Sequence, residues 1–201
     1  MPTTTTNTTP YRQIRALYDS GTITVYQAYS ALIADPAVAR QKLSASPHFK
    51  FTRMTWIKPS WNWMMYRSGY SHKDERQARI LAIKMKREHF EHLLSLACVT
   101  NNHTGTLSEQ EKKCEVRVQW DPERGVSLEK LDYRSIQIGI GASISEIWAN
   151  EWIDSIEDVT ERAKKMKTLI DEGRVQEASE LVPAERPYPL STDLELLLRM
   201  E

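Results

Sequence analysis

Strict alternation of apolar and polar residues in two nearby segments constrains the fold of this chain more than any other feature. In the segment CEVRVQW, the side chains of Val116, Val118 and Trp120 point one way and the polar ones point the other. The segment YRSIQIGIG (133–141) repeats the pattern, with its isoleucines on one face and Gln137 on the opposite face. A period of two is typical of half-buried strands, so both segments predict strands of an antiparallel-rich sheet. The residues DPERG between them predict a turn.

Three further strands are predicted in the first half of the chain. Their segments are short, rich in β-branched and aromatic residues, and bounded by turn residues or by helical patterns. They comprise residues 22–30 (TITVYQAYS), 53–57 (RMTWI) and 80–85 (ILAIKM).

Helical segments lie between these strands. A helix is predicted after the strand 22–30, and Pro36 is expected to interrupt it because proline has no amide hydrogen to donate within a helix. Ser60 is placed to cap a short helix that Gly69 ends. The strand that ends at Met85 is expected to pass into a helix by Phe90.

The last third of the chain is predicted to be helical. Apolar residues recur every four positions from Ile144 through Trp148 and Trp152 to Ile156, which is the spacing of one helix face. The stripe continues to Gly173, and a capping-box pattern at 192–195 predicts one more helix near the C-terminus. Because strands precede and helices follow, the fold class is α+β with a helical C-terminal third.

Composition favours one globular domain. The chain has 201 residues, enough to bury a sizeable core, and we assign residues 11–201 to a single α+β domain. Residues 1–10 are a Thr-rich segment expected to be a disordered tail, and the polar residues 99–113 are expected to form an exposed loop. Lys plus Arg is 27 and Asp plus Glu is 27. This balance argues against a nonspecific nucleic-acid binder, which usually carries a basic excess.

The two cysteines, Cys98 and Cys114, are expected to be free thiols. The N-terminus has no secretory signal, so the chain is predicted to be intracellular and cytoplasmic, where thiols stay reduced. No apolar run reaches the length of a membrane span, and no membrane partner is expected. His89 and His92 lie near Cys98, but a third ligand at suitable spacing is missing, so no metal is expected.

Residues 53–70 (RMTWIKPSWNWMMYRSGY) contain three of the six tryptophans and are the first candidate for a site. Most of these aromatic side chains are expected to be core. Lys58 and Ser60 fit a core less well, because they stand where a strand meets a helix start. Free amide groups at a helix start favour anions, so this junction is predicted to bind one.

Several blocks of the sequence together resemble a known family. They resemble an uncharacterised family, domain of unknown function four-two-nine-one, over nearly everything from Arg12 to Leu190, and this family implies no activity. The blocks are RQIRALYDSGTITVYQAYS, RMTWIKPSWNWMMYRSGY, VRVQWDPERG, YRSIQIGIG, IEDVT and PAERPYPL.

More remotely, the order of strands and helices around TVYQAYS, RMTWI and RILAIKM resembles the ADP-ribosyltransferase superfamily. This resemblance implies a split sheet that holds NAD between its strands. It places Tyr26, Gln27 and Ala28 on the strand that grips NAD, and it places Thr55 and Tyr66 where they frame the nicotinamide.

The chain departs from that superfamily at decisive positions. Gln27 stands where an Arg or His is usual, Ala28 replaces a Gly, and Gln137 stands where the catalytic Glu is expected. A neutral amide can hydrogen-bond the ribose hydroxyls but brings no negative charge to a cationic transition state. Either Glu115 or Glu123 supplies that charge, or the fold serves binding or a different chemistry.

The resemblance therefore implies an NAD-binding domain that transfers ADP-ribose to an unknown acceptor, or one whose activity is altered because Gln137 stands where a catalytic Glu is expected. Gln137 and Tyr66 are the candidate catalytic residues, and Tyr26, Gln27 and Ala28 are candidates for contact with NAD. The expected cleft is lined by Gln27, Thr55, Lys58, Tyr66, Arg134 and Gln137.

Two other functions stay open. In a single-stranded RNA or DNA recognition module, Trp61, Trp63 and Tyr66 would stack on bases beside the cations of 84–87. In an interaction domain, the tryptophans 148 and 152 would dock a partner, although packing within the chain is the favoured interpretation of that stripe.

Overall fold

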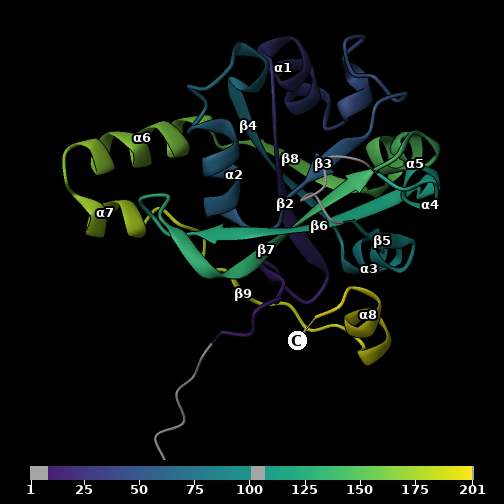
Figure 1. Cartoon of the computed structure of the whole chain (residues 1–201). Coiled ribbons are helices and arrows are strands. Elements are labelled where there is room, and N and C mark those ends of the chain that lie inside the picture. The colour runs from purple at the N-terminus through teal and green to yellow at the C-terminus, as the bar shows by residue number, and fades with distance from the viewer. Residues whose placement is uncertain (1–8, 101–106, 201) are drawn as a thin grey trace, which may run out of the picture.

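Two antiparallel-rich sheets form the centre of the fold in the computed structural model, which describes residues 9–100 and 107–200 (Figure 1). The first sheet has the order β2-β4-β8 and the second has the order β3-β7-β6-β5. Of the pairs in these two sheets, β5–β6 is parallel and the others are antiparallel. The strands are β2 Thr22–Tyr29, β3 Thr55–Ile57, β4 Arg79–Lys86, β5 Ala97–Val99, β6 Val116–Arg124, β7 Lys130–Ile140 and β8 Ile153–Asp158, with a small pair β1 Arg15–Ala16 and β9 Arg186–Pro187. The fold class is therefore α+β.

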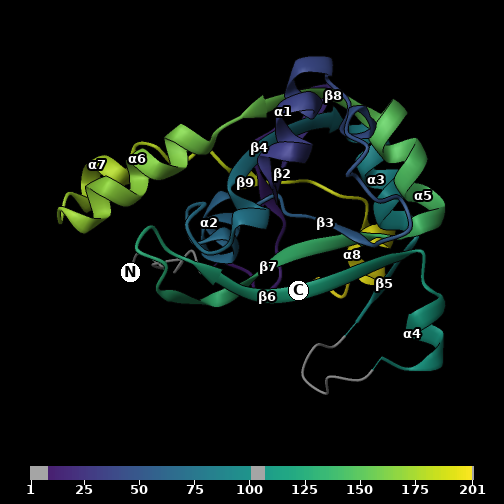
Figure 2. The same cartoon turned by 90° about the horizontal axis from the view of Figure 1, so that it is seen from above.

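Helices flank both sheets. In Figure 2, α2 lies over the β6–β7 pair, and α6 with α7 forms an arm that projects to one side. None of the described helices is both long and apolar enough to span a bilayer. The helices are α1 Ala31–Arg40, α2 Trp61–Ser68, α3 Arg87–Ser95, α4 Glu109–Lys113, α5 Ala142–Ile147, α6 Thr160–Asp171, α7 Val175–Ser179 and α8 Thr192–Leu197.

The two sheets meet where β2 lies beside β3. Tyr26 N donates to Lys58 O over 2.7 Å, and Lys58 N donates to Tyr26 O over 3.1 Å. Beyond this bridge the strands part, and the side chain of Gln27 spans the opening. Its Nε2 donates to Thr55 Oγ1 at 2.7 Å and to Trp56 O at 3.2 Å. The junction thus sets Lys58 between the two sheets.

The predicted helix start after β3 is confirmed. Ser60 caps α2 by accepting a hydrogen bond from Trp63 N, and Gly69 ends the helix in the left-handed conformation. Trp61 and Met65 are fully buried, so most of the aromatic stretch is core as predicted. Tyr66 is 38% exposed and points away from that core.

Pro36 does not interrupt α1, contrary to the sequence prediction. The helix runs through it, although Pro36 has no amide to donate to the carbonyl of Leu32 four residues earlier. The hydroxyl of Ser46 donates to that carbonyl instead, at 2.7 Å. A side chain from the following turn thus replaces the missing backbone donor.

The helical C-terminal third is also a wrong prediction in part. Trp148 and Trp152 lie on a helical segment, α5 followed by a π-helical turn, but Ile156 lies on strand β8. Both helices and strands allow buried residues four positions apart, so the spacing did not separate them. Near the C-terminus the cap of α8 is Ser191, one residue before the predicted Thr192.

Two predicted loops contain regular structure. The predicted turn DPERG instead continues β6 to Arg124, with an irregular register at Pro122. The predicted exposed loop 99–113 begins at the last residue of β5 and ends with α4, and α4 begins at a capping box formed by Ser108 and Glu111.

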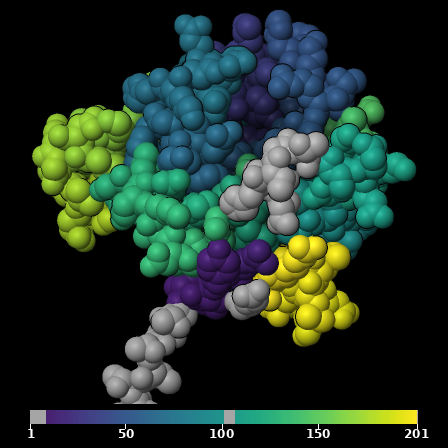
Figure 3. All heavy atoms as spheres, viewed as in Figure 1, coloured from purple at the N-terminus to yellow at the C-terminus, as the bar shows by residue number. Residues whose placement is uncertain are grey.

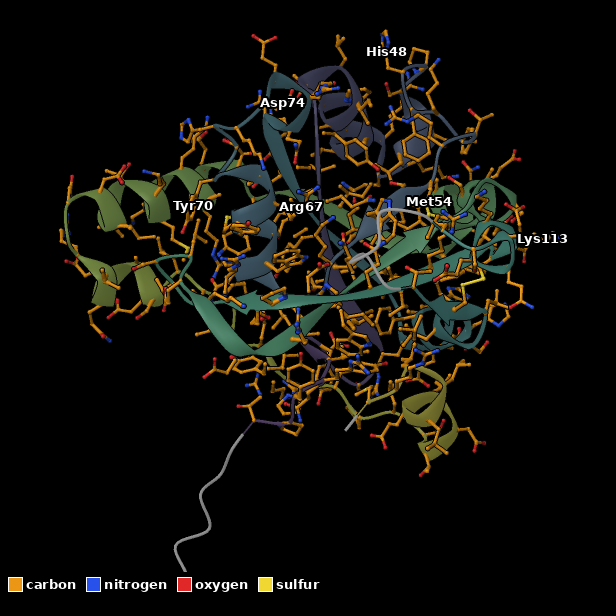
Figure 4. All side chains as sticks on the ribbon, in the orientation of Figure 1. His48, Met54, Arg67, Tyr70, Asp74 and Lys113 are labelled. Atoms are coloured by element: carbon orange, nitrogen blue, oxygen red, sulfur yellow. A yellow bond between two sulfur atoms is a disulfide. The ribbon has the colours of Figure 1, made fainter. Side chains whose placement is uncertain are left out.

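The cysteines are paired, which corrects the expectation of free thiols. Cys98 and Cys114 form a disulfide with Cα atoms 6.3 Å apart, and Figure 4 shows it near Lys113. The bond joins β5 to the residue that follows α4. The predicted disordered tail, residues 1–10, lies outside the described residues except for its last two positions.

Candidate functional site

One cavity, which we name the Lys58 cavity, lies between α2 and the β6–β7 pair. Its volume is about 390 Å³. Aromatic rings, two cations, two amides and one carboxylate surround it. The lining residues are Trp56, Lys58, Trp63, Tyr66, Arg67, Gln119, Asp121 and Gln137.

Lys58 is a buried cation at the base of this cavity. Its side chain is 7% exposed, and Nζ donates to Trp56 O at 3.1 Å. Burial, and secondarily the charge of Arg67, lowers the pKa of Lys58 to about 7. A lysine in this state exchanges its proton near neutral pH and still has N–H donors for a ligand.

A cross-strand pair of polar side chains faces Lys58. Gln137 Nε2 donates to Asp121 Oδ2 at 2.6 Å and to Gln119 Oε1 at 3.0 Å. Burial raises the pKa of the Asp121 carboxyl, while Gln137 and the nearby cations Arg67, Arg134 and Lys58 act in the opposite direction. The site therefore contains a carboxylate, although β7 itself carries an amide.

Aromatic side chains form the wall of the cavity on the α2 side. The ring of Tyr66 stacks on Trp63 with centroids 5.1 Å apart, and the guanidinium of Arg124 lies 3.7 Å from the Tyr66 centroid. Trp56 lies over Gly139, where an added Cβ would come within 3.0 Å of the indole. Gly139 thus permits the close approach of Trp56 to β7.

A second cavity, the Thr55 cavity, fills the opening where β2 and β3 part, and its volume is about 350 Å³. Ala28 and Thr55 line it from the two strands. In Figure 4, Asp74 and His48 lie on two sides of this region near the top of the view, and Met54 lies below them. Figure 3 shows the surface hollowed in this region, with purple atoms of β2 between blue masses on either side. Its other lining residues are Tyr29, Ser30, Ile33, Phe49, Lys50, Arg53, Arg76 and Gln77.

Gln27 and Tyr26 hold the sheets together in this structure. The amide of Gln27 is bonded to Thr55 and Trp56, and its oxygen accepts from the hydroxyl of Tyr29 at 3.0 Å. Tyr26 is 1% exposed and packs edge-on against Trp61. Neither residue lines the cavities described here.

A third cavity, the Arg134 cavity, has a volume of about 240 Å³ and contains the last of the predicted contact residues. Arg134 lies here and not in the Lys58 cavity. The two cavities share the side chains of Gln119 and Asp121. The remaining lining residues are Tyr11, Arg12, Val99, Thr100, Trp120, Pro122 and Lys130.

The predicted residues are thus distributed over adjoining spaces. Tyr66, Lys58 and Gln137 share the Lys58 cavity, while Thr55 and Ala28 line the neighbouring one. Of the carboxylates considered as substitutes for the missing Glu, Glu115 is exposed at the far end of β6. Glu123 is 6% exposed and accepts a hydrogen bond from Ser60 Oγ at 2.9 Å.

Glu123 has a carboxyl neighbour at the start of α2. Glu185 Oε1 accepts a hydrogen bond from Trp61 N at 2.6 Å. Burial is the main cause that raises the pKa of Glu185 to about 8, and the charge of Glu123 adds to it. Burial likewise raises the pKa of Glu123. The helix start predicted to bind an anion is therefore occupied by two carboxyl groups of the chain.

Sequence reasoning missed Asp121 because it ended the strand at Trp120. Once β6 is extended to Arg124, Asp121 falls on the same face as Gln119, opposite Ser135 of β7. The alternation of polar residues at 117, 119 and 121 was a signal that the strand continues past Trp120. The following Pro122 instead suggested a turn.

The fold and its cavities define an antiparallel-rich α+β domain with the Lys58 and Thr55 cavities beside the junction of its two sheets. The chain belongs to the family described as Domain of unknown function (DUF4291), whose family model matches residues 13–188. No curated protein matches the chain with significant similarity.

Proposed function

We propose that the chain is a nucleotide-binding domain of the ADP-ribosyltransferase type, which holds NAD along the Lys58 and Thr55 cavities. The observation that carries the proposal is the grouping of aromatic rings, cations and the Asp121–Gln137 pair around one cavity. A dinucleotide needs all three, because rings stack on bases, cations bind the pyrophosphate and polar groups bind ribose hydroxyls.

The size and position of the two cavities support a ligand with two halves. Small-molecule sites usually have volumes of about 300–1,000 Å³, and each of these cavities is near the lower limit. They approach each other at β3, where Met54 lines one and Trp56 lines the other, and both of these side chains lie against Gly139. In the proposed arrangement the nicotinamide ribose lies beside Asp121, and the adenylate half extends past Trp56.

Asp121 takes the role that the superfamily gives to a glutamate. When the bond between ribose C1′ and the nicotinamide nitrogen breaks, nicotinamide leaves with the electron pair and positive charge develops on the ribose. A carboxylate next to that charge lowers the barrier. Gln137, bonded to Asp121, would orient it and bind a ribose hydroxyl. The acceptor oxygen then attacks C1′ and releases its proton.

Isothermal titration of the purified protein with NAD, NADP and ADP-ribose tests the proposal. We expect binding to the wild type and about tenfold weaker binding to Lys58→Ala, which loses a charge contact. Lys165→Ala is the matched control, since this exposed lysine lies on the remote helix α6. Binding should be unchanged in the control, and melting curves should show both variants folded.

The proposal fails if none of the three ligands produces heat at protein concentrations that would reveal a millimolar dissociation constant. Titration with single-stranded RNA belongs in the same experiment. Salt-dependent RNA binding without NAD binding would indicate that the aromatic rings and cations of the Lys58 cavity bind single-stranded RNA and not NAD.

A further inference from the structure

The Arg134 cavity wraps around the part of β6 that follows its pairing with β5. Along this strand, Gln119 and Asp121 face the Lys58 cavity, and Trp120 and Pro122 face the opposite side, yet all four line the Arg134 cavity. This is possible because β5 pairs with β6 only from Val116 to Val118, so the following residues form an edge among the described strands.

Three cations and one carboxylate line this cavity. The cations are Arg12, Lys130 and Arg134, and none of them forms an ion pair with a described carboxylate. The carboxylate is Asp121, which is hydrogen-bonded to Gln137. The cavity therefore has an excess of positive charge, whereas the whole chain has none.

Contacts with oxygen atoms near both ends of the chain hold the two arginines in place. Arg134 N donates to Tyr11 O at 2.7 Å, and Arg134 Nε donates to the Tyr11 hydroxyl at 2.8 Å. Arg12 pairs with Arg134 in a parallel bridge, and its Nη1 donates to Arg199 O at 3.0 Å. Like charges on paired residues repel, and this repulsion is relieved when an anion binds between them. Fixed guanidinium groups also lose little entropy on binding an anion.

One donor of the cluster is unused. Arg12 Nε is enclosed, and it has no hydrogen-bond partner among the residues that the structure describes. An enclosed donor without a partner is costly, and a ligand oxygen would satisfy it.

From these contacts we infer that the Arg134 cavity binds the phosphate group of the molecule that accepts ADP-ribose. The inference rests on the proposed function for the acceptor role, because Asp121 and Gln119 form the wall shared with the Lys58 cavity. A phosphate held by Arg12 and Arg134 places the rest of its molecule beside that wall. An oxygen of this acceptor then forms the bond to C1′ as nicotinamide leaves, and its proton passes to solvent.

Phosphate binding is tested without NAD. The probes are inorganic phosphate, ribose 5-phosphate, and a short oligonucleotide with and without a 5′-phosphate, and the readout is isothermal titration. We expect the phosphorylated probes to bind the wild type and to bind Arg134→Gln about tenfold or more weakly. Arg134→Lys, which keeps the charge, should bind with intermediate affinity. Lys165→Gln on α6 is the matched control and should bind as the wild type does.

Comparison of the probes identifies the source of the phosphate. Tighter binding of the phosphorylated oligonucleotide than of ribose 5-phosphate assigns the phosphate to a nucleic-acid end, and equal binding assigns it to a small phosphate ester. No binding of any phosphorylated probe, or equal binding to wild type and a folded Arg134→Gln, overturns the inference. If phosphate binds through Arg134 but NAD does not bind at all, the acceptor role is overturned together with the proposed function, and the phosphate site stands alone.

Discussion

Gln137 and Asp121 are joined across the β6–β7 pair, with Gln137 Nε2 2.6 Å from Asp121 Oδ2. The amide of one strand thereby positions the carboxylate of the other inside the Lys58 cavity. β7 itself carries an amide at this place, and the acid comes from the paired strand β6.

Asp121→Asn removes the negative charge and keeps the shape of the side chain. If Asp121 stabilises a cationic ribose, the variant should lose at least about a hundredfold in kcat for nicotinamide release, while NAD affinity changes little. Gln137→Ala should show a smaller loss, because it leaves the carboxylate present but unoriented. Release of nicotinamide, followed by chromatography, is the measurement. Full activity in a folded Asp121→Asn protein would remove Asp121 from the mechanism.

The pH dependence of NAD affinity should follow Lys58. Its pKa is lowered to about 7, mainly by burial, so its positive charge is present below that pH and lost above it. NAD affinity should therefore fall as the pH rises through about 7, and the Lys58→Met variant should show a flatter profile. Titrations at several pH values check this. An unchanged slope in the variant would assign the dependence to another group.

The stability of the wild-type fold should rise with pH, whereas its NAD affinity should fall. The unfolded chain holds a proton on Lys58 up to its ordinary pKa of 10.5, but the folded chain releases it near 7. Between these values the unfolded state binds more protons, so wild-type stability rises with pH. Lys58→Met should be more stable than wild type below pH 7, and the difference should shrink toward pH 10.5. Denaturant titrations at both ends of this range are the test.

Glu185→Gln should stabilise the fold at alkaline pH. The pKa of Glu185 is raised to about 8 from 4.5, mainly by burial, so its contribution to stability is complete below 4.5 and is lost as the pH rises through about 8. A glutamine still accepts the hydrogen bond from Trp61 N and carries no charge. The variant should therefore melt above the wild type at pH 9 and close to it at pH 5. The reverse order would show that Glu185 is ionised in the fold at neutral pH.

The contact between Ser46 and the carbonyl of Leu32 should be coupled to Pro36. Ser46→Ala should cost about 1 kcal/mol in the free energy of unfolding, because it removes the donor that replaces the missing amide. In a Pro36→Ala background the new amide donates to the same carbonyl, so Ser46→Ala should cost less there. Denaturation of the four proteins gives the coupling directly. An equal cost in both backgrounds would contradict it.

Trp148→Ala should be a structural lesion. Trp148 is fully buried and begins the π-helical turn after α5, and removing a buried aromatic side chain typically costs about 3–5 kcal/mol. Ile147→Ala is the control on the same segment, because Ile147 is 39% exposed. A Trp148→Ala protein that melts with the wild type would indicate that this side chain faces a partner and not the core.

The sequence predicted correctly those elements whose residue patterns fit only one kind of secondary structure. Period-two alternation located β6 and β7, and the Ser60 cap with Gly69 bounded α2. A residue pattern that fits both a helix and a strand did not distinguish the two. Trp152 and Ile156 are four residues apart, which suits a helix, but Ile156 also fits the buried face of a strand.

The candidate site depended on contacts between segments distant in the sequence. Lys58 was singled out because it stands at a strand-to-helix junction, and the structure places it in the same cavity as Tyr66 and Gln137. Asp121 was concealed by Pro122, which is tolerated at an irregular point of the strand register. The pairing of Cys98 with Cys114 was missed because the expectation of free thiols was based on the inferred cellular compartment. The distance between the two residues in the fold was not available from the sequence.

The bridge between Tyr26 and Lys58 has a kinetic consequence. In the described chain, the backbones of the two sheets exchange hydrogen bonds at this one place, through the amides of Tyr26 and Lys58. The residue proposed to bind the nucleotide is therefore also a residue that joins the sheets. Amide hydrogen exchange at these two positions reports how often the sheets separate. A ligand bound to Lys58 and also to Ala28 of β2 in the Thr55 cavity would hold the two sheets together and slow that exchange, even with no visible change in the fold.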